Sequence, residues 1–233
     1  PIEWSEATLK ATTRLPKSVK RGNFPQRRDL TDQPLVTIDG ATAKDFDDAV
    51  FAQPLGGRRG WRLIVAIADV AHYAKPNTAL DDDAQMRATS VYLPSFVVPM
   101  LPEAISNELC SLKADVDRLA LVCDMQVAVN GEVRDFDFYD AVIRSHGRLA
   151  YQQVQDHLDN GTELPVARSD QKQVAKSLAA LAMLHDAFRK ARERRGGLDF
   201  ETREGVVEVI DGHVTGVNPV HRHTAHQMIE EAM

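Results

Sequence analysis

Short apolar runs separated by turn residues predict β-strands along much of the chain. Three of these runs are short enough to be strands: Leu35–Ile38, Ala49–Ala52 and Leu63–Ala68. Two longer runs, Leu119–Val129 and Val133–Ile143, are separated by Asn130-Gly131, a dipeptide that favours the left-handed turn of a β-hairpin. The same arrangement returns nearer the C-terminus, in Val206–Ile210, Asp211-Gly212 and His213–Val217. The pattern therefore predicts several strands, some of them paired as hairpins.

Apolar residues spaced three and four apart predict helices between these strands. Leu80–Arg87 has acidic residues in its first turn, where a helix favours negative charge. A second helical face stops at Asn160-Gly161 and comprises Tyr151, Val154 and Leu158. A longer amphipathic helix ends at Gly196-Gly197 and is marked by Val174, Leu178, Leu181, Leu184 and Phe188. Ala225–Met233 resembles a helix in mid-course, so we expect the chain to continue. Strands and helices together predict an α+β fold with a mixed β-sheet packed against α-helices.

The composition narrows the class of protein. A chain of 233 residues can bury one good core or two small ones. Its 43% hydrophobic and 27% charged residues are ordinary for a globular protein, and no apolar run approaches the roughly 20 residues of a membrane span. The two cysteines, Cys110 and Cys123, make neither a disulfide framework nor a zinc site. We therefore expect no membrane partner and a reducing, cytoplasmic setting.

The net charge of −6 is unevenly distributed. Residues 1–28 carry seven Lys and Arg residues against two Glu residues, which leaves the remainder strongly acidic. The basic segment can follow a phosphate backbone, or it can be a solvated lead-in to the folded domain. Charge alone does not decide between these two interpretations.

Four aspartates fall within ten residues: Asp39, Asp45, Asp47 and Asp48. The stretch is flanked on both sides by apolar sequence that is typical of buried strands. Carboxylates gathered beside a core repel one another and lose hydration, so they stay ionised only if a cation compensates. Mg²⁺ takes oxygen ligands, keeps waters and binds best where a substrate phosphate completes its shell. The stretch therefore predicts a metal site for phosphate-ester chemistry.

Other interpretations start from the same residues. Acidic loops commonly meet solvent and do nothing more. A calcium EF-hand loop needs glycine at its sixth position and glutamate at its twelfth, and counting from Asp39 or from Asp45 satisfies neither condition. Asp45-Phe46-Asp47 resembles the two-aspartate signature of some phosphatases. A calcium loop is thus excluded, while a solvated loop and a phosphatase stay open.

Further motifs follow the aspartate stretch along the chain; in order, the segments are Thr37–Val50, Ile67–Tyr73, Arg87–Leu112, Asp117–Ala120, Gly197–Phe200 and Ala225–Met233. Together they resemble the ribonuclease II / ribonuclease R family of exoribonucleases, in which matching segments occur in the same order. Several long motifs in register make the resemblance specific. Residues 1–28 then form a basic, irregular lead-in, and residues 29–233 form the N-terminal portion of a truncated ribonuclease II-type catalytic domain.

The resemblance implies an α+β catalytic domain and a hydrolase that depends on Mg²⁺ or Mn²⁺. It implies processive cleavage of single-stranded RNA from the 3′ end to 5′-mononucleotides. Two such ions about 4 Å apart activate a water and stabilise the departing oxygen of an in-line displacement. In the family the domain continues past the point matched by Met233, with an arginine near the metals and β-barrel RNA-binding domains on both sides. We expect a monomer that is part of a longer polypeptide; whether residues 1–233 act alone stays open.

The resemblance also assigns roles to the aspartates. Asp39, Asp45, Asp47 and Asp48 match the family's four acidic active-site positions one by one. We expect Asp39 and Asp48 to be the firmest metal ligands and Asp47 to be the most rate-critical carboxylate, with Asp45 completing the cluster. Lys44 either softens the carboxylate repulsion, meets a phosphate, or is a plain surface lysine.

Four other residues match positions that handle RNA in the family. Tyr92 and Phe200 correspond to aromatic rings that stack on terminal nucleotides, a sequence-tolerant contact that contributes roughly 1–3 kcal/mol per base. Taken without the family, both rings read as core residues. Tyr151 and Glu231 correspond to positions near the 3′-terminal sugar, where a hydroxyl or a carboxylate can hydrogen-bond the 2′-hydroxyl that DNA lacks. Without the family they read as a helix-start residue and a solvated residue.

The histidines near the C-terminus and two polar residues of the matching segment Arg87–Leu112 give weaker predictions about function. No zinc motif surrounds His221, His223 and His226, which we expect to open the terminal helix. Asn107 and Ser111 are expected to shape a loop near the RNA channel. The alternative to an active nuclease is a catalytically inactive RNA-binding or regulatory module on the same fold.

Overall fold

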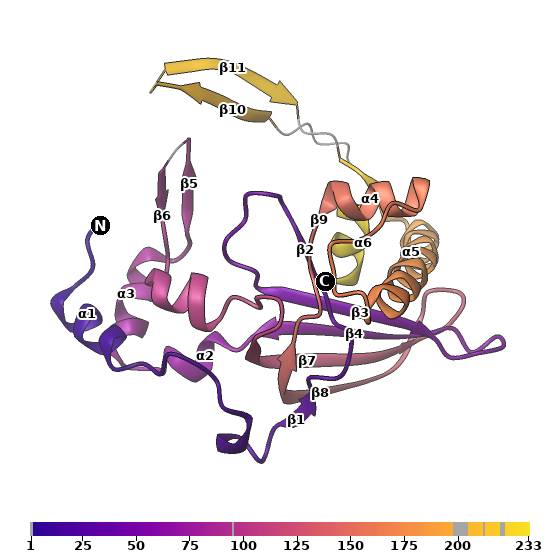
Figure 1. The fold of residues 1–233 in the computed structure, drawn as a ribbon, viewed down its shortest axis with the longest axis horizontal. Coiled ribbons are helices and arrows are strands. Elements are labelled where there is room, and N and C mark those ends of the chain that lie inside the picture. The colour runs from indigo at the N-terminus through magenta and orange to yellow at the C-terminus, as the bar shows by residue number, and fades with distance from the viewer. Residues whose placement is uncertain (1, 95, 198–204, 212, 220–221) are drawn as a thin grey trace.

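A five-stranded mixed sheet forms the centre of the computed structural model (Figure 1), which describes residues 2–94, 96–197, 205–211, 213–219 and 222–233. In sheet order its strands are β1 (Arg28–Leu30), β8 (Val133–Arg144), β7 (Asp117–Val127), β4 (Trp61–Ala68) and β3 (Asp48–Pro54). β1 pairs with β8 in parallel, and the other neighbours are antiparallel. The predicted mixed sheet and the predicted β7–β8 hairpin are confirmed.

Alternating side chains of β4 build a core on each face of this sheet. Leu63 and Val65 join one cluster, and Ile64 and Ala66 join the other. Because both faces are covered, β4 is apolar along nearly its whole length rather than alternating. The sheet is therefore a rigid base for the loops at its ends.

Three helices lie together on one side of the sheet (Figure 1): α4 (Tyr151–Asn160), α5 (Gln171–Arg194) and α6 (Thr224–Ala232). Four of the five apolar residues predicted for the longest helix are buried, namely Val174, Leu178, Leu181 and Leu184, and Phe188 is partly buried against the same core. The second core contains residues from three shorter elements, α2 (Val70–Tyr73), α3 (Ala79–Arg87) and η2 (Ala104–Leu109). In the described parts of the chain, no helix has the length and apolar character needed to cross a membrane.

Three two-stranded pairs complete the strand structure. They are β2 (Thr37–Asp39) with β9 (Arg148–Ala150), β5 (Val91–Leu93) with β6 (Phe96–Val98), and β10 (Gly205–Ile210) with β11 (His213–Pro219). The β10–β11 hairpin was predicted from its turn residues, whereas the sequence analysis did not predict β5–β6. Figure 1 shows β5–β6 projecting from the body of the molecule.

The N-terminal segment differs from the irregular lead-in that the sequence predicts. It contains α1 (Glu6–Thr13), whose N-cap Ser5 accepts a hydrogen bond from Thr8 N–H, and η1 (Arg21–Asn23), and its last residue, Arg28, is the first residue of β1. Three of its arginines are paired with carboxylates: Arg21 with Asp117 at 3.0 Å, Arg28 with Asp137 at 2.7 Å, and Arg27 with Asp69. These cations hold the segment to the sheet. The division of the chain at residue 28 stays a prediction.

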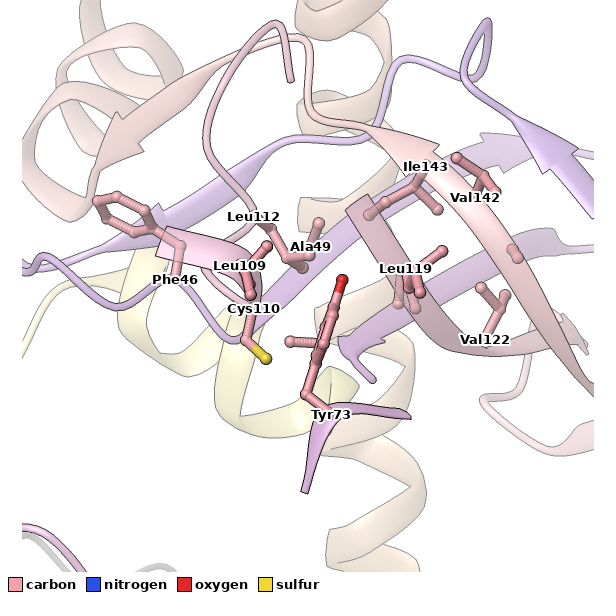
Figure 2. Close-up of a cluster of buried hydrophobic side chains, with 14 of the residues drawn as sticks. Phe46, Ala49, Tyr73, Leu109, Cys110, Leu112, Leu119, Val122, Val142 and Ile143 are labelled. Carbon is pink, nitrogen blue, oxygen red and sulfur yellow. The ribbon is translucent and has the colours of Figure 1, made fainter. Parts of the chain in front are cut away.

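Phe46 anchors the segment between β2 and β3 in the second core. Its ring is 5% exposed and packs in the cluster that includes Leu109 and Leu112 (Figure 2). Ser111, which is fully buried, binds the same segment by two hydrogen bonds of 3.1 Å: its Oγ accepts from Phe46 N–H and donates to the carbonyl of Lys44. This confirms the expected loop-shaping role of Ser111.

Replacing Ser111 by alanine should destabilise the protein by about 1–3 kcal/mol, because Phe46 N–H and the Lys44 carbonyl lose a shared buried partner. Chemical denaturation of the wild type and of Ser111→Ala measures this difference. The control is Thr13→Ala, which removes an exposed hydroxyl that bonds Lys10 O and should change stability by less than about 0.5 kcal/mol. Equal stabilities of the two variants would contradict the buried role.

Candidate active site

The ends of β2 and β3 bring the first and last of the four aspartates together. β2 ends at Asp39 and β3 begins at Asp48. Just outside them, Val36 and Val50 exchange two backbone hydrogen bonds of 3.1 and 2.9 Å, which closes the loop at its base. We call residues 39–48 the aspartate loop. Asp39 and Asp48 thus sit on paired backbone, while Asp45 and Asp47 lie on the loop between them.

The burial of Phe46 aims its neighbours outward. Because Phe46 points into the core, Asp45 and Asp47 on either side of it face away from the core. All four aspartates line one cavity of about 620 Å³, which we call the aspartate cleft. Its other lining residues include Lys44, Ser90, Tyr92, Glu103 and Asn107. The carboxylates therefore share a cleft instead of pointing separately into bulk solvent.

Loss of hydration and mutual repulsion raise the pKa values of three of these carboxyls. Burial, followed by the charges of Asp39 and Asp47, raises the pKa of Asp48 to about 6. Burial is also the main cause of the raised pKa of Asp39, to which the charge of Asp45 adds against the hydrogen bond from Gly40 N–H. Asp47 keeps exposed surface, and its pKa is raised by lost hydration in the cleft and by Asp45 and Asp39. The folded chain thus holds several carboxylates in a state that a cation would relieve.

The donor set suits a hard divalent cation. All four side chains offer carboxylate oxygen, and Asp48 Oδ2 is buried with no hydrogen-bond partner. Two other oxygens are engaged: Asp39 Oδ1 accepts from Gly40 N–H at 2.6 Å, and Asp45 Oδ2 accepts from the Tyr92 hydroxyl at 2.9 Å. Among the residues that the structure describes, no three His, Cys, Asp or Glu side chains converge closely enough to hold an ion unaided. The oxygens fit Mg²⁺ or Mn²⁺ provided that waters or phosphate oxygens complete the shell.

Tyr92, which is predicted to stack on RNA, borders the aspartate cleft. It stands on β5, its side chain is 65% exposed, and its hydroxyl reaches across to Asp45. An exposed ring at the border of the aspartate cleft has a free face for stacking, so the alternative of a core tyrosine is wrong. Its part in RNA binding stays a prediction.

Tyr151 reaches the aspartates through strand pairing. Ala150 on β9 pairs with Asp39 on β2, and Tyr151 is the next residue, at the start of α4. Its ring stacks on His226 with centroids 3.9 Å apart. Burial, then the charges of Asp39, Asp48 and Glu230, raise the pKa of Tyr151 to about 12, so the hydroxyl stays protonated. Tyr151 is therefore a hydrogen-bond donor beside the carboxylates.

The structure does not bring Glu231 to the aspartates. Its carboxylate pairs with Arg192 of α5 at 2.7 Å, is 13% exposed and borders a different cavity with Phe188 and Met233. The neighbouring Glu230 is the one whose charge acts on Tyr151, and it also pairs with Arg222. The assignment of Glu231 to RNA stays a prediction, and Glu230 is a candidate that the sequence analysis missed. Phe200 lies outside the described residues.

The described histidines of the predicted cluster lie at the start of α6, and Lys44 lies at the aspartate cleft. His223 is the N-cap of α6, and His226 Nδ1 accepts from its N–H at 3.1 Å, as expected of residues that open the helix. His221 lies outside the described residues. Lys44 lines the aspartate cleft and also the cavity next to it, which leaves its role open.

Comparison with known proteins adds a family match. A sequence model of the family described as the RNB domain matches residues 27–233. Ribonuclease R of Escherichia coli is 44% identical over 234 residues, which cover 100% of this chain and 28% of that protein. The chain thus spans little more than a quarter of the length of this relative.

Solved structures agree with the sequence match. Mycoplasma genitalium RNase R in complex with ribose methylated single-stranded RNA superposes with a TM-score of 0.90 at 34% identity. The match covers 98% of this chain and 35% of that one. The same enzyme in complex with double-stranded RNA gives a TM-score of 0.90 at 34% identity, with 98% and 40% of the two chains covered. The α+β architecture with its mixed sheet is therefore that of RNase R.

The raised pKa of Asp48 predicts how stability depends on pH when divalent ions are chelated. Between about pH 4 and 6 the unfolded chain ionises Asp48 before the folded chain does, so stability falls as pH rises. Asp48→Asn removes this penalty and should stabilise the chelated protein by about 1–2 kcal/mol at pH 7.5, after allowance for solvent screening, with little effect at pH 4. Thermal unfolding in a chelator at both pH values measures the difference.

Asp135→Asn on the exposed part of β8 is the matched control and should have no such pH-dependent effect. A destabilised Asp48→Asn protein at pH 7.5 would contradict the picture of a carboxylate held without compensation. Addition of Mg²⁺ should raise the melting temperature of the wild type more than that of Asp48→Asn.

Proposed function

Because this chain belongs to the RNB domain family, we propose that it is the catalytic part of a ribonuclease that degrades single-stranded RNA from its 3′ end. The products are 5′-mononucleotides, and several are released before the strand dissociates. The observation that carries the proposal is the gathering of four carboxylates in one cleft, where Asp48 Oδ2 is buried without a partner. The alternative, an inactive RNA-binding module, has no observation in its favour, since all four acidic positions are present.

The carboxylates would hold the cofactor. When bound, two divalent ions supply a water of lowered pKa and positive charge for the departing 3′ oxygen. Asp39 and Asp48 are the proposed firmest ligands, since both sit on paired backbone and can keep fixed positions. Asp47 is the proposed rate-critical carboxylate, and its exposed position on the loop leaves it free to face the scissile phosphate. Asp45 is restrained by the hydroxyl of Tyr92.

The RNA strand would be oriented by the two tyrosines. Tyr92 offers a ring face to a base at the border of the aspartate cleft. Tyr151 offers a protonated hydroxyl beside Asp39, where it can donate to a ribose 2′-hydroxyl. A base contact near Asp45 and a sugar contact near Asp39 would hold the end of the strand at the aspartates, which favours release of one nucleotide at a time.

Replacing Asp47 by asparagine should lower kcat of the full-length protein on single-stranded RNA by at least about 100-fold, because a carboxylate facing the reacting phosphate is lost. The assay is gel analysis of uniformly labelled RNA with Mg²⁺, where release of mononucleotides without intermediate internal cuts is expected. Asp135→Asn serves as the control and should retain full activity. Internal cleavage ladders, or undiminished turnover by Asp47→Asn, would refute the proposal; RNA binding by the wild type without turnover would favour the inactive module.

Replacing Tyr92 by alanine should raise KM for RNA about 5- to 150-fold, which corresponds to the loss of roughly 1–3 kcal/mol of base stacking. Tyr92→Phe keeps the ring and removes the hydroxyl that bonds Asp45, so its KM should stay near the wild-type value. Steady-state kinetics on short oligoribonucleotides distinguish the two variants. Equal KM values for alanine and phenylalanine would show that the ring does not stack on the substrate.

A further inference from the structure

The aspartate loop has few internal hydrogen bonds to oppose the repulsion among its carboxylates. It carries four negative side chains, and the described backbone hydrogen bond within its tip is a single turn contact, from Ala43 N–H to the carbonyl of Gly40 at 3.1 Å. Like charges that line one cleft repel one another, and this repulsion favours a more open loop. A loop with so little internal pairing must be held from outside to keep its carboxylates together.

Arg148 holds the loop from the side of β9. Its Nη2 donates to two loop carbonyls, that of Ala41 at 2.8 Å and that of Ala43 at 3.1 Å. Its guanidinium also lies over the ring of Phe46, 4.8 Å from the ring centroid. One planar cation therefore contacts three residues of the loop, and its charge counteracts the rise in the pKa of Asp39.

Ser111 and Leu112 hold the same loop at different points. Ser111 binds Lys44 and Phe46, as described above, and Leu112 N–H donates to the carbonyl of Phe46 at 2.8 Å. Arg148 donates to the carbonyls of Ala41 and Ala43, which precede these residues in the sequence. The loop backbone is thus fixed at residues 41, 43, 44 and 46 by two separate parts of the chain.

Arg148 does not line the aspartate cleft. It borders the adjoining cavity of about 740 Å³ together with Phe46 and Lys113, and this cavity shares Ala43 and Lys44 with the aspartate cleft. Arg148 therefore acts on the carboxylates through the backbone that carries them and through its charge, without lining the cleft.

We propose that Arg148 is the positioning residue of this site: by donating to the Ala41 and Ala43 carbonyls and stacking on Phe46, it holds the aspartate loop in the conformation that gathers the four carboxylates. The proposal rests on the proposed function only in assigning that conformation to metal and RNA. Residues that orient metal ligands from behind typically contribute 10- to 100-fold to metal affinity or activity. The fixed loop itself is a separate, measurable property.

The test compares three variants of the full-length protein. Arg148→Met removes the cation and both hydrogen bonds but keeps a long apolar side chain. Arg148→Lys keeps the charge and can still donate, but it lacks the planar group that stacks on Phe46. Arg144→Met is the matched control, because Arg144 lies four residues earlier and donates to Asp117 Oδ1 at 2.9 and 2.6 Å, away from the loop.

Two readouts do not depend on RNA hydrolysis. Hydrogen exchange of peptides spanning residues 40–47, in chelator, should be at least about tenfold faster in Arg148→Met than in the wild type. The dissociation constant of Mn²⁺, measured by electron paramagnetic resonance, should rise about tenfold. Arg148→Lys should give values between those of the wild type and Arg148→Met, and Arg144→Met should match the wild type in both measurements. On RNA, kcat of Arg148→Met should fall 10- to 100-fold with KM changed less than about threefold.

Unchanged loop exchange and Mn²⁺ affinity in Arg148→Met would overturn the inference. It would also be overturned if Arg144→Met changed both quantities as much, since the effect would then be general destabilisation. If Arg148→Met does not fold, Arg148→Lys decides: values equal to the wild type in both measurements reject a role for the planar stack. If both readouts behave as expected while the wild type hydrolyses no RNA, the proposed function fails and the role of Arg148 in the loop stands.

Discussion

Repulsion among four carboxylates within ten residues is the constraint that the surrounding structure has to satisfy. A solvated loop would relieve it by spreading the charges apart. Here the bridge between Val36 and Val50 closes the base of the loop, and burial of Phe46 fixes its middle. The loop backbone therefore cannot open to move the carboxylates apart. The unfavourable energy remains in the folded state, where lost hydration and then the charges of Asp39 and Asp47 raise the pKa of Asp48.

Holding the carboxylates together requires rigid strands, and the hydrophobic cores on both faces of the sheet make β2 and β3 rigid. β3 carries Asp48 at its first residue, and its following residues are buried on both faces of the sheet. β2 carries Asp39 at its last residue and is buried up to that point. The two aspartates therefore inherit fixed positions from strands that cannot shift without disturbing packed side chains. The loop between them depends on contacts from distant parts of the chain.

Local patterns in the sequence predicted those elements whose cause is local. Apolar runs, the turns at Asn130 and Asp211, and the helical face of Val174 all correspond to observed strands or helices. The helix at the N-terminus had a signal in Ser5, which caps it, but residues 1–28 were predicted to be an irregular lead-in. The β5–β6 hairpin was not predicted, because nearly all of its residues are exposed and the sequence therefore shows no alternation of buried and exposed positions there.

The candidate site divides in the same way. The four aspartates were predicted because they are close in sequence, and the structure places them in one cleft. Arg148 had no such signal, since its partners on the loop lie 107 and 105 residues away. Glu230 and Glu231 are neighbours on α6, where successive residues point about 100° apart, so sequence alone could not tell which one faces Tyr151. Only the packing of α6 against α4 and α5 separates them.

The absence, among the described residues, of three converged ligands has a consequence for the proposed chemistry. Carboxylates that line a cleft without closing a shell leave coordination positions for other oxygens, and in the proposed function a phosphate of the RNA strand would supply one. Metal and RNA would then each form part of the other's binding site, and by linkage each would raise the affinity of the other by the same factor. A loop held by Arg148 and Ser111 would favour this coupling, because the carboxylates would not have to be reassembled for each nucleotide.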